Sequence, residues 1–295
     1  MDQNRPEEIR RSVIAGSWYP GSRADLERTV DGFLANVEEG KVKGQLIGLI
    51  APHAGYIYSG QVAAYAYKQL EREAFDTVAV ISPVHRMYLA SVAVTTYRYY
   101  ETPLGLVEVD SELVEALGRE VGLQRVGRDE EHSLEIQLPF LQRALGEFTL
   151  LPIMMGDQSW ETEQALGQAL AKALKGKKAL LVASTDLSHF YDYETAVSLD
   201  RVVLRHIEAF DPEGLAWDLA ARRCEACGGG PVVAVMLAAR ALGANRATVL
   251  QYANSGDVTG DRRRVVGYAA GAVYGRMKDE GGGMGDGGWG MGEQQ

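Results

Sequence analysis

The chain contains three apolar, strand-like runs, and helical patterns follow the first and the third of them. The runs lie at 46–51, 75–82 and within 177–190, and Pro52 and Pro83 close the first two. An alanine-rich helical pattern begins at residue 60, and another occupies 194–210. Continuous apolar strands separated by helices are typical of a largely parallel sheet covered on both faces. The sequence therefore predicts an α/β fold.

The remaining patterns extend this fold over most of the chain. A helix is expected after Ser22, a suitable N-cap, because Leu26, Val30 and Phe33 recur at helical spacing. Residues 98–110 read as a hairpin and 148–156 as a strand, with further helices at 111–123, 133–145, 162–174 and 232–242. We expect a single domain over 12–276, with a mostly parallel or mixed central sheet between helical layers. Residues 1–11 form a charged lead, and 277–295 a flexible tail too rich in glycine to offset its ordering entropy.

Charge and hydropathy argue against two classes of partner. The net charge of −10 repels a nucleic-acid backbone, and the short basic cluster 262–264 is expected to be a solvated face. The most apolar stretch, 230–244, contains Arg240 and falls short of the ~20 residues that span a bilayer. The first residues lack the apolar core of a secretory signal. We expect a cytoplasmic protein that binds neither nucleic acid nor membrane.

Side chains suited to metal binding follow the expected strand ends. His53 follows the first strand, His85 the second and Asp186 the third. In open α/β sheets ligands bind outside the carboxyl ends of the strands, and neighbouring strands lie about 5 Å apart. Imidazoles that meet a carboxylate or thiolate in one pocket suit a divalent transition metal. If these strands are neighbours, the sequence predicts a metal site there.

Cys227 can supply a thiolate to the same site. It precedes three glycines and Pro231, which we expect to be the first residue of a helix. The positive end of the helix dipole should lower the pKa of this thiol and favour metal ligation or redox reactivity. Cys224 completes a C-x-x-C spacing, but far from the first strand where a redox pair usually lies. We interpret Cys224 as incidental.

Three further histidines have different expectations. His189 lies just past the third strand, beside the expected site. His132 adjoins Glu131 and precedes a helix expected to start at Ser133, with Glu135 in its first turn. His132 either assists proton transfer or makes a structural hydrogen bond, and the sequence leaves both open. His206 lies within a helical pattern and is expected at the surface or the edge of the core.

Eight motifs occur together in a fixed order. They are "AGSWYP" (15–20), "IAPHAGYIYSG" (50–60), "ISPVH" (81–85), "EEHSLEIQLPFL" (130–141), "STDLSHF" (184–190), "CGGGP" (227–231), "YANSGD" (252–257) and "VGYAAGAVY" (266–274). The set, running from about residue 12 to 275, resembles the Memo family, whose bacterial and archaeal members are also called AmmeMemoRadiSam system protein B.

This resemblance implies a fold and a set of site residues. The family is similar in fold to class III extradiol (LigB-type) non-haem iron dioxygenases. By the resemblance His53, His85 and Cys227 fall on metal-ligand positions, and Asp186 and His189 on pocket positions. Trp18 and Tyr56 fall on the pocket rim, with aromatic packing at a loop junction as the alternative. The dioxygenases use a carboxylate as third ligand. A thiolate there prefers softer metals, which argues against extradiol ring cleavage.

These observations lead to three alternative functions. The first is iron- or copper-dependent redox or oxygen chemistry, with zinc as a further option for the metal and with His189, Asp186 and His132 in catalytic roles. The second is a non-catalytic module that binds a peptide or partner in a vestigial pocket. The third is hydrolysis with Cys227 as nucleophile and His189 as base. The resemblance also implies a small molecule or peptide as ligand, and radical S-adenosylmethionine and AMMECR-type proteins as partners.

Overall fold

A twelve-stranded mixed sheet crosses the part of the chain that this computed structural model describes, residues 8–38, 42–71 and 73–276. The strands are β1 Ile9–Arg10, β2 Gln45–Ala51, β3 Thr77–Pro83, β4 Val92–Thr95, β5 Tyr99–Thr102, β6 Gly105–Val109, β7 Leu123–Val126, β8 Thr149–Met155, β9 Ala179–Ser184, β10 His189–Tyr191, β11 Arg246–Asn254 and β12 Val265–Gly275. Their order is β1-β5-β6-β8-β3-β9-β2-β12-β10, with β11 paired to β12 and β4 to β7 and β8. The single-domain α/β architecture expected from the sequence is confirmed.

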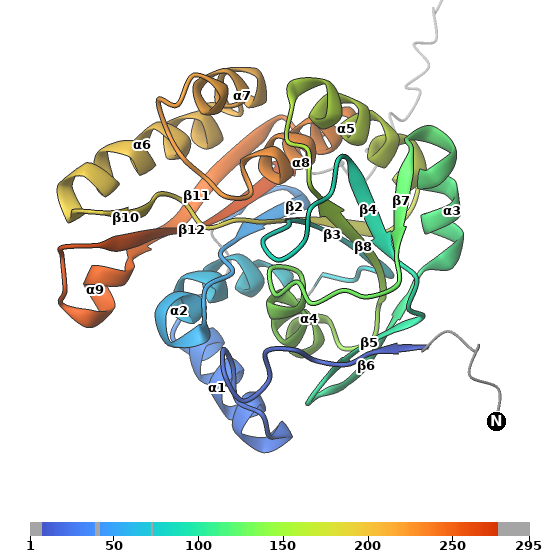
Figure 1. Cartoon of the computed structure of the whole chain (residues 1–295), viewed down its shortest axis with the longest axis horizontal. Coiled ribbons are helices and arrows are strands. Elements are labelled where there is room, and N and C mark those ends of the chain that lie inside the picture. Colours follow the sequence, from blue (N-terminus) through green and yellow to red (C-terminus); the bar gives the residue numbers. More distant parts are fainter. Residues whose placement is uncertain (1–7, 39–41, 72, 277–295) are drawn as a thin grey trace, which may run out of the picture.

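Helices cover both faces of this sheet. They are α1 Arg23–Ala35, α2 Tyr56–Tyr67, α3 Ser111–Glu120, α4 Leu138–Leu145, α5 Trp160–Leu174, α6 Tyr193–Ala209, α7 Pro212–Ala220, α8 Gly229–Ala241 and α9 Ser255–Thr259, with 3-10 turns at Lys68–Leu70 and Glu135–Gln137. Helix α8 packs on β2, β3 and β9, and α5 and α7 pack on α8. On the other face α2 packs on β2, β11 and β12, next to α1 and α4 (Figure 1).

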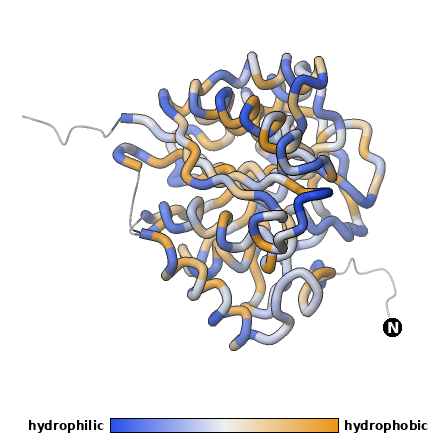
Figure 2. The backbone as a smooth tube through the Cα atoms, turned by 90° about the vertical axis from the view of Figure 1, so that its left-hand side faces the viewer, coloured by the Kyte–Doolittle hydropathy of each residue, from blue (hydrophilic) through white to orange (hydrophobic). Residues whose placement is uncertain are grey.

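The central strands are apolar throughout because both of their faces are covered. Every residue of β3 is buried, and so are all residues of β2 after Gln45. Along the outer helices, hydrophobic and hydrophilic stretches alternate (Figure 2), as expected where one side of a helix faces the core. Burial of this apolar surface is the main driving force for the three-layer arrangement. In the described part of the chain, no helix is both long and apolar enough to cross a membrane.

Several predicted boundaries shift in the structure. Helix α2 begins at Tyr56, four residues before the alanine-rich pattern, and α8 begins at Gly229, so Pro231 is its third residue rather than its first. The helix expected from Ser133 is wrong in its first turn. Residues Glu135–Gln137 form a 3-10 turn and α4 starts only at Leu138. The predicted tail, 277–295, and residues 1–7 of the lead lie outside the described residues.

A buried ionic cluster anchors the N-terminal strand. Residues 9 and 10, assigned to the lead from sequence, form β1 and pair in parallel with β5. Arg10 is 1% exposed; its Nε lies 2.8 Å from Asp129 Oδ2, and its Nη1 pairs with Glu135. Both carboxylates are buried as well. The Glu135 carboxylate therefore neutralises a buried guanidinium in place of the helix-dipole role expected from the sequence.

Replacing Arg10 with alanine should strongly destabilise the fold. Removing one partner of a buried ion pair leaves an uncompensated charge and costs about 3–5 kcal/mol. The exposed pair of Arg11 with Glu101 provides the control, since Arg11→Ala should cost under about 1 kcal/mol. Urea unfolding of both variants measures the difference. Equal stability losses would show that burial does not govern the Arg10 cluster.

A second buried acid makes stability depend on pH. Glu163, in the first turn of α5, is 2% exposed, and its Oε2 has no hydrogen-bond partner. Burial raises the pKa of Glu163 to about 8, and the nearby charges of Asp157 and Glu161 add to the shift. Because the pKa of Glu163 is higher in the folded chain, the folded chain still holds this proton at pH values at which the unfolded chain has lost it. Stability should therefore fall as pH rises from about 4.5 to 8.

Glu163→Gln should remove this dependence. Relative to the unsubstituted chain, the variant should gain about 3.5 kcal/mol of stability between pH 5 and pH 8, because the folded chain keeps the proton of Glu163 over roughly 2.5 of these pH units and each unit is worth about 1.4 kcal/mol. Urea denaturation at both values gives the difference. Glu194→Gln, at an exposed acid in the first turn of α6, is the matched control and should show no such gain. A pH-independent effect of Glu163→Gln would contradict the assignment.

Candidate metal centre

Three parallel strands bring the candidate ligands to one edge of the sheet. β3, β9 and β2 are consecutive neighbours, and their registers align Ile81 with Ala183 and Ala51 with Ser184. His53, His85 and Asp186 each lie two residues past the end of their strand. The condition set by the sequence, that these strands be neighbours, is met.

The three expected ligand groups converge. One ligand atom from each of His53, His85 and Cys227 lies within 4.8 Å of the other two. Cys227 Sγ is 3.1 Å from His53 Nε2, and the His53 and His85 ring centroids are 5.1 Å apart, edge to face. His53 is 2% exposed, whereas His85 is open to solvent. The cluster is therefore buried on one side and accessible on the other.

The hydrogen bonds of Ser184 fix the tautomer of His53. Ser184 Oγ donates its one proton to the carbonyl oxygen of Ser133 at 2.6 Å. His53 Nδ1, 3.0 Å from the same oxygen, must then be the donor to it, since a hydroxyl has only one proton. Neutral His53 consequently carries its proton on Nδ1 and presents the lone pair of Nε2 to Cys227. This is the arrangement that a metal-binding imidazole requires.

Cys227 is held at the end of β9 by close backbone approach. Its N–H donates to Asp186 O at 3.2 Å, and Asp186 N–H donates to Cys227 Sγ at 3.3 Å. A Cβ on Gly228 would lie 2.2 Å from Ser184 O. Only glycine at position 228 permits this approach, so the glycine run after Cys227 serves to bring α8 against the strand end.

The expectation of a low pKa for the Cys227 thiol is wrong. Burial raises the pKa of Cys227 far above its ordinary value, and the charge of Asp186 raises it further. The hydrogen bond from the backbone of Asp186 opposes this rise without outweighing it. The thiol is therefore protonated in the metal-free pocket. A metal ion would bind it as thiolate and release that proton.

Burial also keeps the histidines of this region neutral. It lowers the pKa of His53 well below its ordinary range and the pKa of His132 to about 3, and neighbouring imidazoles add to both shifts. Burial is also the main cause that lowers the pKa values of His85 and His189. Burial raises the pKa of Asp186 to about 7, although its Oδ1 accepts a hydrogen bond from His53 N–H at 2.7 Å. Neutral imidazoles are the form that binds metal.

Glu131 is a residue of this site that sequence reasoning did not identify. Its carboxylate accepts hydrogen bonds from the backbone N–H groups of His85 (2.9 Å), Arg86 (2.6 Å) and Met87 (3.2 Å). It thereby fixes the loop that carries His85. The only sequence signal was its place next to His132, whose ring centroid lies 4.8 Å from that of His85.

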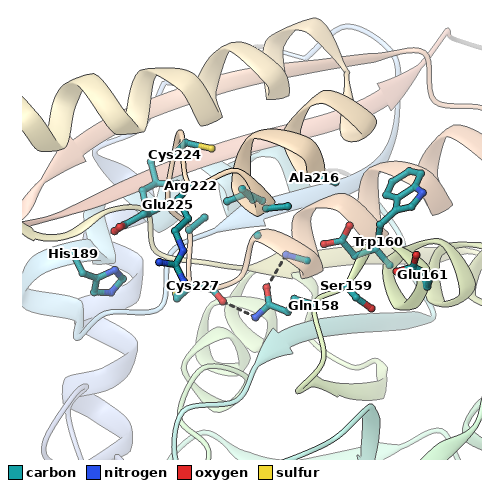
Figure 3. A pocket seen from close by; sticks show the side chains of 17 residues that line it. Gln158, Ser159, Trp160, Glu161, His189, Ala216, Arg222, Cys224, Glu225 and Cys227 are labelled. Carbon is teal, nitrogen blue, oxygen red and sulfur yellow. Dashed lines mark hydrogen bonds between the residues drawn. The ribbon is translucent and has the colours of Figure 1, made fainter.

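A cavity of about 790 Å³ adjoins the cluster. Figure 3 shows Cys227 and His189 on one side of it and Trp160 and Glu161 on the other. Gln158 also lines this cavity; it donates a hydrogen bond to Cys227 O and accepts one from Gly230 N–H, both at 2.8 Å. His189 thus shares a cavity with the candidate ligand Cys227.

The two aromatic residues expected at the pocket rim differ in position. The Trp18 ring lies 4.3 Å, centroid to centroid, from that of His132 and therefore borders the histidine cluster. Tyr56 is 4% exposed, and its hydroxyl donates to Ile136 O at 2.8 Å. Its ring packs against Tyr19 and Phe140. In this structure Tyr56 is part of the core under the site.

Cys224 and His206 lie outside the cluster of ligand atoms. Cys224 is buried, and burial raises the pKa of its thiol to about 11. His206 lies between two aspartates, with Nδ1 3.1 Å from Asp211 and Nε2 2.9 Å from Asp218. Both of its ring nitrogens are engaged in structural contacts.

Comparisons with known proteins agree with the motifs. A family model described as "Memo-like protein" matches residues 10–272. A "MEMO1 family protein" of Methanosarcina mazei is 41% identical, and one of Methanothermobacter thermautotrophicus is 40% identical. The alignments cover 89% and 88% of this chain and 98% and 99% of those proteins. A relative from Nitrosopumilus maritimus is 36% identical over 89% of this chain and 98% of its own length.

A solved structure supports the architecture. The uncharacterized protein JW3007 from Escherichia coli K12 superposes with a TM-score of 0.52 at 14% identity, covering 77% of this chain and 99% of that one. At this identity the likeness concerns the fold alone. The family model and the curated relatives, which span nearly the whole described domain, decide the assignment: this chain belongs to the Memo family.

Proposed function

We propose that the chain is a metal-dependent redox protein that binds iron or copper through His53, His85 and Cys227. The observation that carries the proposal is the convergence of two imidazoles and one thiol, from three distant parts of the chain, within 4.8 Å of one another. A second observation is that one of the imidazoles is held in the tautomer that metal binding requires. Here the Nε2 lone pair of His53 faces Cys227 Sγ because Ser184 holds the proton of the other ring nitrogen.

The donor set favours soft and borderline metals. Thiolate and imidazole together suit copper, iron and zinc, whereas hard cations prefer oxygen ligands. Such a site with open positions would supply one-electron transfer or oxygen chemistry when iron or copper is bound. One thiolate and two neutral imidazoles leave a net charge of −1 on the ligands, which a divalent cation offsets.

Nearby residues of the chain would handle protons and substrate. Asp186, with its pKa near 7, can hold or release a proton at physiological pH, and its Oδ2 lies 4.0 Å from His53 Nε2. His189 lines the cavity beside Cys227 and can exchange a proton with a ligand there. We propose His132 as a third such group while no metal ion is bound to it, and a small molecule or peptide segment as the occupant of the cavity.

Metal content provides the first test. Protein purified without chelators should carry iron or copper in close to one equivalent, and Cys227→Ala should lose most of it because a ligand is missing. Cys224→Ala is the matched control and should retain the metal. Elemental analysis of the three proteins decides. Negligible iron and copper in all of them, with partner binding that survives loss of both His53 and His85, would favour the non-catalytic binding module instead.

Ser184→Ala tests the role of the tautomer. Without the hydroxyl, nothing fixes the proton on His53 Nδ1, so the metal affinity should fall by about 10- to 100-fold, as for other partners that orient a ligand. Competition with a chelator measures the affinity. Ser188→Ala removes a buried hydroxyl that has no hydrogen-bond partner and should leave it unchanged. An unaltered affinity in Ser184→Ala would show that the tautomer does not matter.

A further inference from the structure

We propose that His85, Glu131 and His132 form a second divalent-cation site, which adjoins the centre at Cys227 and shares His85 with it. One ligand atom from each of these three residues lies within 4.8 Å of the other two. Glu131 Oε2 is 3.9 Å from His85 Nδ1. The donor set is two imidazoles and one carboxylate, and it does not include the thiolate.

Glu131 is a buried carboxylate without a cationic side chain to pair with. It is 1% exposed, and among the described residues the one basic side chain within ion-pair distance is His85, which is charged only when protonated. Arg10 donates to the backbone carbonyl of Glu131 and forms its ion pairs with Asp129 and Glu135 instead. A buried charge that lacks a counter-charge is costly. The backbone N–H groups that bind Glu131 orient the carboxylate, and a cation beside Oε2 would supply the missing charge.

His132 provides a second, independent observation. Its side chain is 7% exposed, and Nδ1 is fully buried without a hydrogen-bond partner. Buried polar atoms normally have a partner, so an orphaned ring nitrogen requires an explanation. Its ring centroid lies 4.8 Å from His85 and 5.7 Å from His53. One ring nitrogen of His132 lies within 4.8 Å of ligand atoms of His85 and Glu131, so a metal ion among the three residues would give this ring a partner.

His85 can bind an ion at either ring nitrogen. A neutral imidazole has one available lone pair, so His85 binds both ions at once only as a bridging imidazolate that has released its ring proton to solvent. An imidazole can bind metal through either ring nitrogen, and Nδ1 of His85 is on the side of Glu131. His85 is also the exposed member of the group, so ions can reach it from solvent. Two nitrogens and one carboxylate oxygen form a harder donor set than one with a thiolate. The two positions should therefore differ in metal preference.

The test isolates the second site. In His53→Ala/Cys227→Ala both ligands unique to the first centre are absent, whereas His85, Glu131 and His132 remain. Titration of this variant with Co²⁺ should give one bound equivalent and no thiolate-to-cobalt absorption. Adding His132→Ala should weaken Co²⁺ binding by at least about tenfold. Loss of a residue that only orients a ligand already costs about tenfold or more, and loss of a ligand should cost no less. Adding Glu130→Gln, at the exposed neighbouring acid, should not change it.

The outcomes separate this proposal from the proposed function. Thiolate-to-cobalt absorption in the unsubstituted chain, with no Co²⁺ bound by His53→Ala/Cys227→Ala, overturns the second site and leaves the first intact. Binding that is indifferent to His132→Ala also overturns it. Circular dichroism checks the folding of each variant, and His132→Asn replaces His132→Ala if the latter unfolds. A Co²⁺ anomalous diffraction peak between residues 85, 131 and 132 supports the proposal directly; a peak elsewhere contradicts it.

Discussion

The parallel pairing of β3, β9 and β2 is the constraint on which the site depends. Because these strands are neighbours with their carboxyl ends level, residues separated by more than one hundred positions begin their loops side by side. The burial of apolar side chains that stabilises the sheet therefore also sets the spacing of the polar groups at its edge. His53, His85 and Asp186 need only short loops to meet.

Fixed loops turn this proximity into a defined geometry. Glu131 holds the loop of His85 through three backbone N–H groups, and the ionic cluster around Arg10 holds the segment that contains Glu131. On the other side, the missing side chain of Gly228 lets Cys227 approach the end of β9. A chain of hydrogen bonds and ion pairs thus connects the N-terminal strand to the candidate metal centre, although the two are distant in sequence.

The sequence predicted the elements whose pattern is local. Continuous apolar runs identified β2, β3 and β9, and the strand-end rule placed His53, His85 and Asp186 at one edge. The features that the sequence did not reveal depend on contacts distant in the chain. The burial of Arg10 and Glu135, the hydrogen bonds of Glu131 and the position of Tyr56 in the core leave no periodic signal. The Cys227 thiol was misjudged because a helix dipole is visible in sequence, whereas the depth of burial, which outweighs it, is not.

The central claim is that sulfur from Cys227 and nitrogen from two histidines bind one metal ion. X-ray absorption spectroscopy of the iron- or copper-loaded chain measures the ligand atoms directly. We predict one sulfur neighbour at roughly 2.3 Å, the length of a typical metal–thiolate bond, together with imidazole nitrogen scattering. A first shell made up of nitrogen and oxygen alone, in protein with its thiol intact, would contradict the account.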